Sequence, residues 1–157
     1  MNPSTIVSYV AAVALSVACD ASSAADPCSV AYKSATDNAS FEQCRALAVA
    51  GDTSAQLGYG LILWSGYDRE PNRSEALEWW RRAARQGYPL AQIALADFLG
   101  SSDLDPALRD DAEAYAWQSA LGLEPKASAL WKTLSPEQQK RAKRLAEEFK
   151  TKYVLPR

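Results

Sequence analysis

The fold is decided by residues 51–87, GDTSAQLGYGLILWSGYDREPNRSEALEWWRRAARQG, because this stretch is repeated. The motif Gly-x-x-x-Ala-Gln that starts at Gly51 returns 36 residues later, at Gly87. The motif Ala-x-x-Trp that starts at Ala76 returns 38 residues later, at Ala114. A period in the middle thirties is typical of stacked helical hairpins.

Capping and breaking residues divide each unit into two helices. Gly51 and Gly87 are expected just after a helix C-terminus, where a left-handed residue is favoured, and Asp52 is expected to cap the next helix. The two additional residues of the second unit are placed in the polar loop 101–106. The expected helices span residues 53–64 and 74–86 in the first unit, and residues 89–99 and 109–121 in the second.

Small and large side chains alternate in a way that explains why such hairpins stack. Small residues let helix backbones approach closely at Gly58, Gly60, Ala76, Ala83 and Ala84. Trp79 lies on the same helix face as Ala76 and Ala83. We therefore expect the rings of Trp79 and Trp117 in the core rather than in a binding site.

This pattern resembles the Sel-one-like repeat (SLR), a bacterial relative of the tetratricopeptide repeat, over residues 51–122. The positions that carry the resemblance are Ala55, Gln56, Gly60, Gly66, Ala76, Trp79, Ala83, Ala84 and Gly87 in the first copy, and Ala91, Gln92, Ala114 and Trp117 in a degenerate second copy. The resemblance implies an all-α fold, a short right-handed α/α solenoid of stacked antiparallel hairpins. It also implies an adaptor or scaffold that offers a concave surface to another protein or peptide.

The flanking segments are expected to close the two ends of the repeat. Residues 26–50 contain a weaker copy of the unit and are predicted to form a degenerate N-terminal helical cap. Residues 123–157 are predicted to form C-terminal capping helices, a short one at 127–133 and a longer one that a capping box at Ser135 begins. Lys, Arg and Glu mix on the longer helix, which favours a solvated outer face. Binding of an anionic lipid or an acidic partner is the alternative.

The amino terminus has the pattern of an export signal. Residues 6–18 are apolar and uncharged, and these 13 residues are fewer than the roughly 20 that a membrane-spanning helix needs. Residues 1–25 are therefore predicted to be a signal peptide, and the mature domain to lie in the periplasm or envelope. Small residues before the end of this segment favour a soluble product. Alternatively, residues 16–19 resemble a lipoprotein motif, in which Cys19 would be lipidated and would tether the chain to a membrane.

The two other cysteines are Cys28 and Cys44. In an oxidising compartment an even number of thiols in a small domain favours a disulfide. Two buried free thiols are the alternative.

Composition excludes several classes of function. The chain has 157 residues, with 17 Lys and Arg against 19 Asp and Glu, so it is not a strongly basic nucleic-acid binder. It has no histidine, which excludes histidine-based triads and histidine zinc sites. No phosphate loop or nucleophile elbow occurs. We therefore predict no catalytic residue, no metal site and no cofactor.

The leading hypothesis is an exported adaptor that binds an extended peptide or a partner surface on the face of the first helix of each unit, together with the loop aromatics Trp64, Tyr67 and Tyr88. Packing of these rings against the next hairpin is the alternative. Two other hypotheses stay open: an envelope hydrolase that uses a loop carboxylate, Asp68 or Glu70, and a lipid-anchored spacer held through Cys19.

Overall fold

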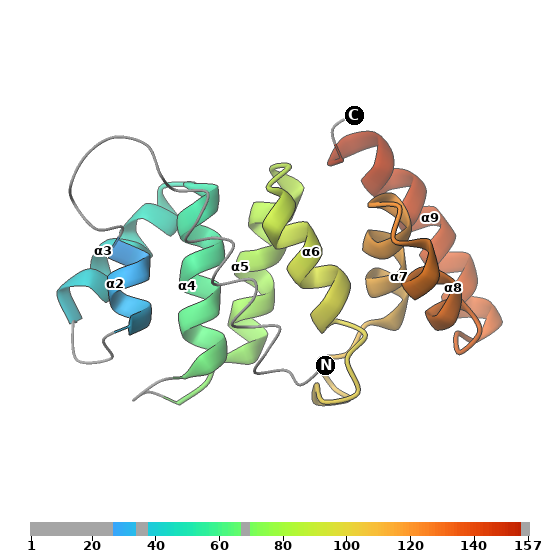
Figure 1. Cartoon of the computed structure of the whole chain (residues 1–157), viewed down its shortest axis with the longest axis horizontal. Coiled ribbons are helices and arrows are strands. Elements are labelled where there is room, and N and C mark those ends of the chain that lie inside the picture. The colour runs from blue at the N-terminus through green and yellow to red at the C-terminus, as the bar shows by residue number, and fades with distance from the viewer. Residues whose placement is uncertain (1–26, 34–37, 67–69, 155–157) are drawn as a thin grey trace. The chain divides into compact units, whose positions relative to one another are not determined.

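The computed structural model describes residues 27–33, 38–66 and 70–154, and these residues form helices and loops but no strand (Figure 1). The expected all-α fold is therefore confirmed for this part of the chain. The predicted signal peptide with Cys19, and the loop residues Tyr67 and Asp68, lie outside the described residues. The helices are α2 (Pro27–Lys33), α3 (Asn38–Val49), α4 (Thr53–Ser65), α5 (Arg73–Arg85), α6 (Pro89–Phe98), α7 (Asp111–Ala120), α8 (Glu124–Trp131) and α9 (Pro136–Lys152).

The chain divides into two compact units, one ending at Ala83 and the other starting at Ala84. In the first unit α2 packs against α3 and α4, and α3 also packs against α4. In the second unit α7 packs against α6, α8 and α9, as Figure 1 shows in yellow to red.

The helix boundaries follow from the capping residues. Asp52 caps α4, since its carboxylate accepts the backbone N–H of Ala55 at 2.7 Å. α7 begins two residues later than expected because Asp110 is itself the cap and accepts the N–H of Glu113 at 3.0 Å. α8 begins three residues earlier than expected, at Glu124, because a proline in the first helical turn needs no hydrogen-bond acceptor. The capping box at the start of α9 is confirmed.

The two repeat glycines end helices as expected. Gly51 and Gly87 have φ of 100° and 84°, a conformation that a residue with a Cβ rarely adopts. The N–H of Asp52 donates to the carbonyl of Leu47 at 3.1 Å, which closes the last turn of α3. The glycines thus set where one helix stops and the next hairpin begins.

Both repeat tryptophans are in the core, as predicted. Trp79 is 8% exposed and meets the ring of Tyr59 edge-on, with 5.5 Å between centroids. Trp117 is 1% exposed and stacks on Phe149 at 4.0 Å. Each ring therefore holds its own helix, α5 for Trp79 and α7 for Trp117, against a neighbouring helix of the same unit.

A third tryptophan, Trp80, is packed more tightly and carries the crossing of α4 and α5. It is 0% exposed, and its indole N–H donates to the carbonyl of Leu57 at 3.2 Å. The ring lies directly over Gly60, and a Cβ at Gly60 would stand 2.6 Å from Cδ1 of Trp80. Sequence reasoning correctly gave Gly60 the role of a small residue at a helix crossing but did not identify its partner.

We predict that Gly60→Ala destabilises the protein by about 1–3 kcal/mol, although alanine is the better helix former, because the added methyl group overlaps the Trp80 ring. Urea unfolding followed by circular dichroism measures this change. The smaller ring in a Gly60→Ala, Trp80→Phe double variant should recover part of the loss. If the double variant is as unstable as the sum of the two single variants, the overlap is not the cause.

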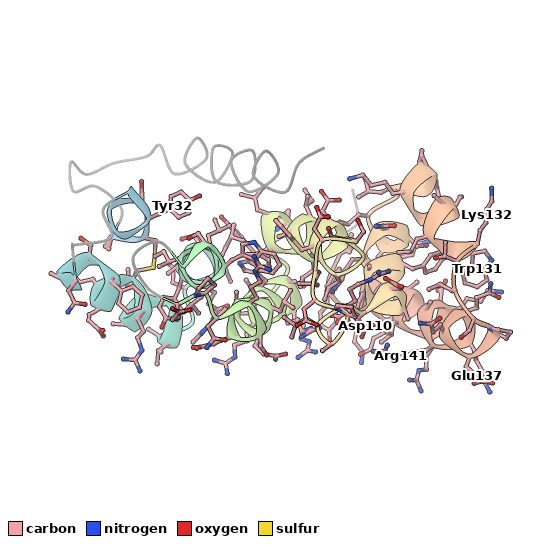
Figure 2. All side chains as sticks on the ribbon, turned by 90° about the horizontal axis from the view of Figure 1, so that it is seen from below. Tyr32, Asp110, Trp131, Lys132, Glu137 and Arg141 are labelled. Carbon is pink, nitrogen blue, oxygen red and sulfur yellow. A yellow bond between two sulfur atoms is a disulfide. The ribbon has the colours of Figure 1, made fainter. Side chains whose placement is uncertain are left out.

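The predicted disulfide is present. Cys28 on α2 and Cys44 on α3 are bonded, with 4.8 Å between their Cα atoms (the yellow bond in Figure 2). Both residues are buried, at 4% and 0% exposure. A helix as short as α2 is not stable alone in water, so the bond keeps α2 on the core of the first unit.

Replacing both cysteines by alanine should lower the free energy of unfolding by about 3 kcal/mol, the entropy of closing a loop of this size. Denaturant unfolding of the double variant and of the oxidised parent measures the difference. Adding a reductant during unfolding should bring the parent down to the stability of the variant and leave the variant unchanged. Equal stability of variant and oxidised parent would contradict the structural role of this bond.

Asp52 makes stability depend on pH. The backbone N–H of Ala55 and the hydroxyl of Ser54 both donate to its carboxylate, at 2.7 Å each, and hold its pKa below the ordinary value. A group with a lowered pKa in the folded state stabilises the protein above its unfolded pKa, about 3.9. That contribution is lost as the pH falls through the lowered folded pKa.

We therefore expect Asp52→Asn to reduce the loss of stability between about pH 5 and pH 2, because asparagine caps the helix without titrating. Thermal unfolding of both proteins across this pH range gives the comparison. Parallel stability curves for parent and variant would show that Asp52 does not carry this dependence.

Candidate interaction surface

Helix α4, the first helix of the first repeat, offers little surface to a partner. Most of its side chains are buried, and α2 lies across one of its sides. A Cβ at Gly58 would stand 2.7 Å from the Cβ of Cys28, so the two helices approach as closely as a glycine allows. The disulfide-bonded segment therefore covers part of α4, one of the helices on which an extended peptide was expected.

The three aromatic residues proposed for binding do not form one described site. Trp64 is 9% exposed, its ring stacks on Trp80 with 5.2 Å between centroids, and the Arg73 guanidinium lies 5.3 Å from its centroid. The packing alternative thus accounts for Trp64, because core contacts use most of its ring. Tyr67 lies outside the described residues, and half-buried Tyr88 belongs to the second unit, where it precedes α6.

The second unit presents a more open surface, which we call the α6–α8 face and define by Pro89, Ile93, Asp97 and Lys126. Pro89, Ile93 and Asp97 are four residues apart and so follow one side of α6. Ile93 is 38% exposed, which makes it one of the few large apolar side chains open to solvent in the described residues. The ammonium of Lys126 on α8 reaches the carboxylate of Asp97 at 2.6 Å. This ion pair links the exposed sides of the two helices.

The glutamine of the repeat supports the backbone beneath this face. The side-chain N–H₂ of Gln92 donates to the carbonyls of Ala84 at 3.1 Å and Tyr153 at 2.8 Å. In the first repeat, Gln56 donates in the same way to Ala48 at 3.2 Å. The carbonyls at a helix C-terminus have no intrahelical donor. Each glutamine side chain donates a hydrogen bond to one of these carbonyls, that of Ala48 or that of Ala84. Sequence reasoning identified the Ala-Gln pair but not this role.

An acid that pairs with each repeat tryptophan was also missed. The indole N–H of Trp79 donates to Glu75 at 3.2 Å, and that of Trp117 donates to Glu113 at 3.5 Å. The sequence held a signal, since each glutamate precedes its tryptophan by four residues and the two pairs are 38 residues apart. The glutamates orient buried rings, so they are structural rather than catalytic.

A groove of about 430 Å³ at the start of α7 is lined by charged side chains that already pair with one another. The guanidinium of Arg141, from α9, makes two bonds of 2.7 Å to the carboxylate of Asp110 (labelled in Figure 2). Arg109 reaches Asp111 at 3.0 Å. The Arg141–Asp110 pair fastens α9 to the start of α7, and both acids have a cationic partner, so the groove is structural.

The carboxylates considered for hydrolysis gain no support. Glu70 is exposed, and Asp68 lies outside the described residues.

In the part of the chain that the structure describes, no helix is long and apolar enough to cross a membrane.

The fold and its repeated contacts define a class of protein, the α/α solenoids built from short helical hairpins. Comparison with protein families matches Sel1 repeats at residues 53–88 and 89–117, so this part of the chain carries two Sel1 repeats, as the resemblance implied. Among solved structures it is similar to a protective antigen present in uropathogenic Escherichia coli strains that displays an SLR fold, with a TM-score of 0.63 and 21% identity. The alignment covers 98% of this chain and 34% of that one, so this chain spans about a third of its length. At this identity the likeness shows the fold alone. A search among curated proteins finds no match.

Proposed function

We propose that this Sel1-repeat protein is an exported adaptor or scaffold of the bacterial envelope that binds another protein through its α6–α8 face. Sel1 repeats generally mediate contacts between proteins, which supports the class of function. The disulfide between Cys28 and Cys44 supports export, because such bonds persist in oxidising compartments.

The observation that carries the choice of surface is the exposed apolar side chain of Ile93 beside the ion pair of Asp97 and Lys126. An apolar contact with a polar rim is the usual composition of a protein interface. Helical repeats commonly bind a partner along one side of successive helices. The partner would place an apolar side chain on Ile93 and a hydrogen-bonding group beside Asp97.

A photo-crosslinking residue at position 93 tests this proposal in the native envelope. Ile93 should give one discrete adduct, while the same residue at Gln43, which is exposed on α3, should not. The adduct should fall at least severalfold when Asp97→Lys reverses a charge of the ion pair, since like charges at an interface are unfavourable. Identical adduct patterns at positions 93 and 43 would contradict the assignment of this face.

Fractionation of the same cells tests export separately. Recovery with periplasmic markers supports a soluble product. Metabolic palmitate labelling that disappears in Cys19→Ser would instead assign the chain to the envelope as a lipid-anchored protein.

A further inference from the structure

Helix α2 depends on the disulfide more than its two neighbours do. It has 7 residues, whereas α3 has 12 and α4 has 13, and a helix as short as α2 is not stable without support. Of the α2 side chains that the structure describes, Cys28 and Tyr32 join the apolar cluster of the first unit. Figure 1 shows α2, in blue, beside α3 and α4. The covalent bond at Cys28 therefore supplies a large part of what keeps this helix in place.

Helix α3 has contacts with α4 that do not involve the disulfide. The ring of Phe41 lies 5.5 Å from the ring of Tyr59, measured between centroids. The side chain of Gln56 donates to the carbonyl of Ala48 at 3.2 Å. In addition, α3 continues directly into α4 through the turn at Gly51. Breaking the disulfide would therefore free α2 and leave α3 packed against α4.

The disulfide lies against α4 at a point where that helix has no side chain. A Cβ at Gly58 would stand 2.7 Å from the Cβ of Cys28. The Sγ atoms of Cys28 and Cys44 each lie 3.9 Å from the carbonyl oxygen of Ala55. Ala55 and Gly58 are three residues apart and so share a side of α4. This side is covered by α2 while the bond is intact.

We infer that α2 is an oxidation-dependent latch on the first unit. While Cys28 and Cys44 are thiols, α2 leaves α4 and uncovers the side that carries Ala55 and Gly58. Formation of the disulfide returns α2 to that side, so a change in thiol chemistry becomes a change in packing. The inference rests on the export proposed above, because an oxidising compartment is where such a bond forms and persists.

The latch closes by thiol–disulfide exchange with a protein that carries an oxidised pair of cysteines. The Cys28 thiolate, on the released segment, attacks one sulfur of that disulfide and expels the other as a thiolate. The Cys44 thiolate then attacks the Cys28 sulfur and expels the remaining sulfur of the oxidant. The oxidant leaves as a dithiol, with the two electrons and two protons that the chain has lost.

Hydrogen exchange of the purified full chain, followed by mass spectrometry, tests the latch. The amides of α2 should be protected in the oxidised chain. With dithiothreitol they should exchange about tenfold faster or more, because an undocked short helix opens locally. The amides of α3 and α5 should stay protected. The variant Cys28→Ser with Cys44→Ser should match the reduced chain with or without dithiothreitol.

Two outcomes of this experiment would overturn the inference. The first is unchanged protection of α2 after reduction, since α2 would then stay docked without the bond. The second is loss of protection over α3, α4 and α5 together with α2. The disulfide would in that case hold the whole first unit rather than one movable helix.

Alkylation by iodoacetamide gives a second measurement of the same event. Cys44→Ala leaves Cys28 as the reporter, and peptide mapping separates its product from that of Cys19. In the folded chain Cys28 should react within about threefold of its rate in urea, because a thiol on an undocked segment is accessible. Cys44, measured in Cys28→Ala, should react more slowly than Cys28 because α3 stays packed. A Cys28 that the fold protects about tenfold or more would show that α2 remains docked.

These measurements use the purified chain, so their failure would overturn the latch and leave the proposed export untouched. Recovery of the chain with cytoplasmic markers would instead overturn the export, whatever α2 does on reduction.

Discussion

Close approach of helices at positions without a side chain is the constraint on which this protein depends. The indole of Trp80 lies on Gly60 where another residue would need a Cβ, and its N–H donates to the Leu57 carbonyl. The contact combines burial, a satisfied polar group and a short interhelical distance. The hairpin of α4 and α5 follows from it, since either a larger residue at Gly60 or a smaller ring would separate the helices or leave a cavity.

Packing of this kind within the repeats leaves some sides of the helices covered and others open to solvent. Glutamines supply donors to the ends of preceding helices, and glutamates orient the tryptophans, so that buried polar groups are paired. The disulfide-bonded α2 covers part of the first repeat, which leaves α6 with α8 as the more open pair. In the second unit Arg141 fastens α9 to the start of α7. Binding surfaces in such a fold are the helix sides that packing does not use.

Prediction from sequence succeeded where the signal was periodic or chemically specific. The positions of the repeat helices were confirmed to within two residues, because glycine at a left-handed position and a capping carboxylate act locally. The pairing of Cys28 with Cys44 followed from counting. Prediction from sequence was less successful for Trp64, which looked like a loop aromatic but packs on Trp80, a contact that depends on how two helices cross.

The sequence by itself determined the all-helical class, the repeat and the residues that begin and end each helix, since these depend on neighbours within a few positions. Only the tertiary structure decided which side of each helix is covered. Charge shows this most clearly. Arg141 and Arg144 are three residues apart on α9 and look alike in the sequence, but Arg141 bonds to Asp110 at the start of α7, whereas Arg144 is exposed. Which of them remain available to a partner is therefore a property of packing.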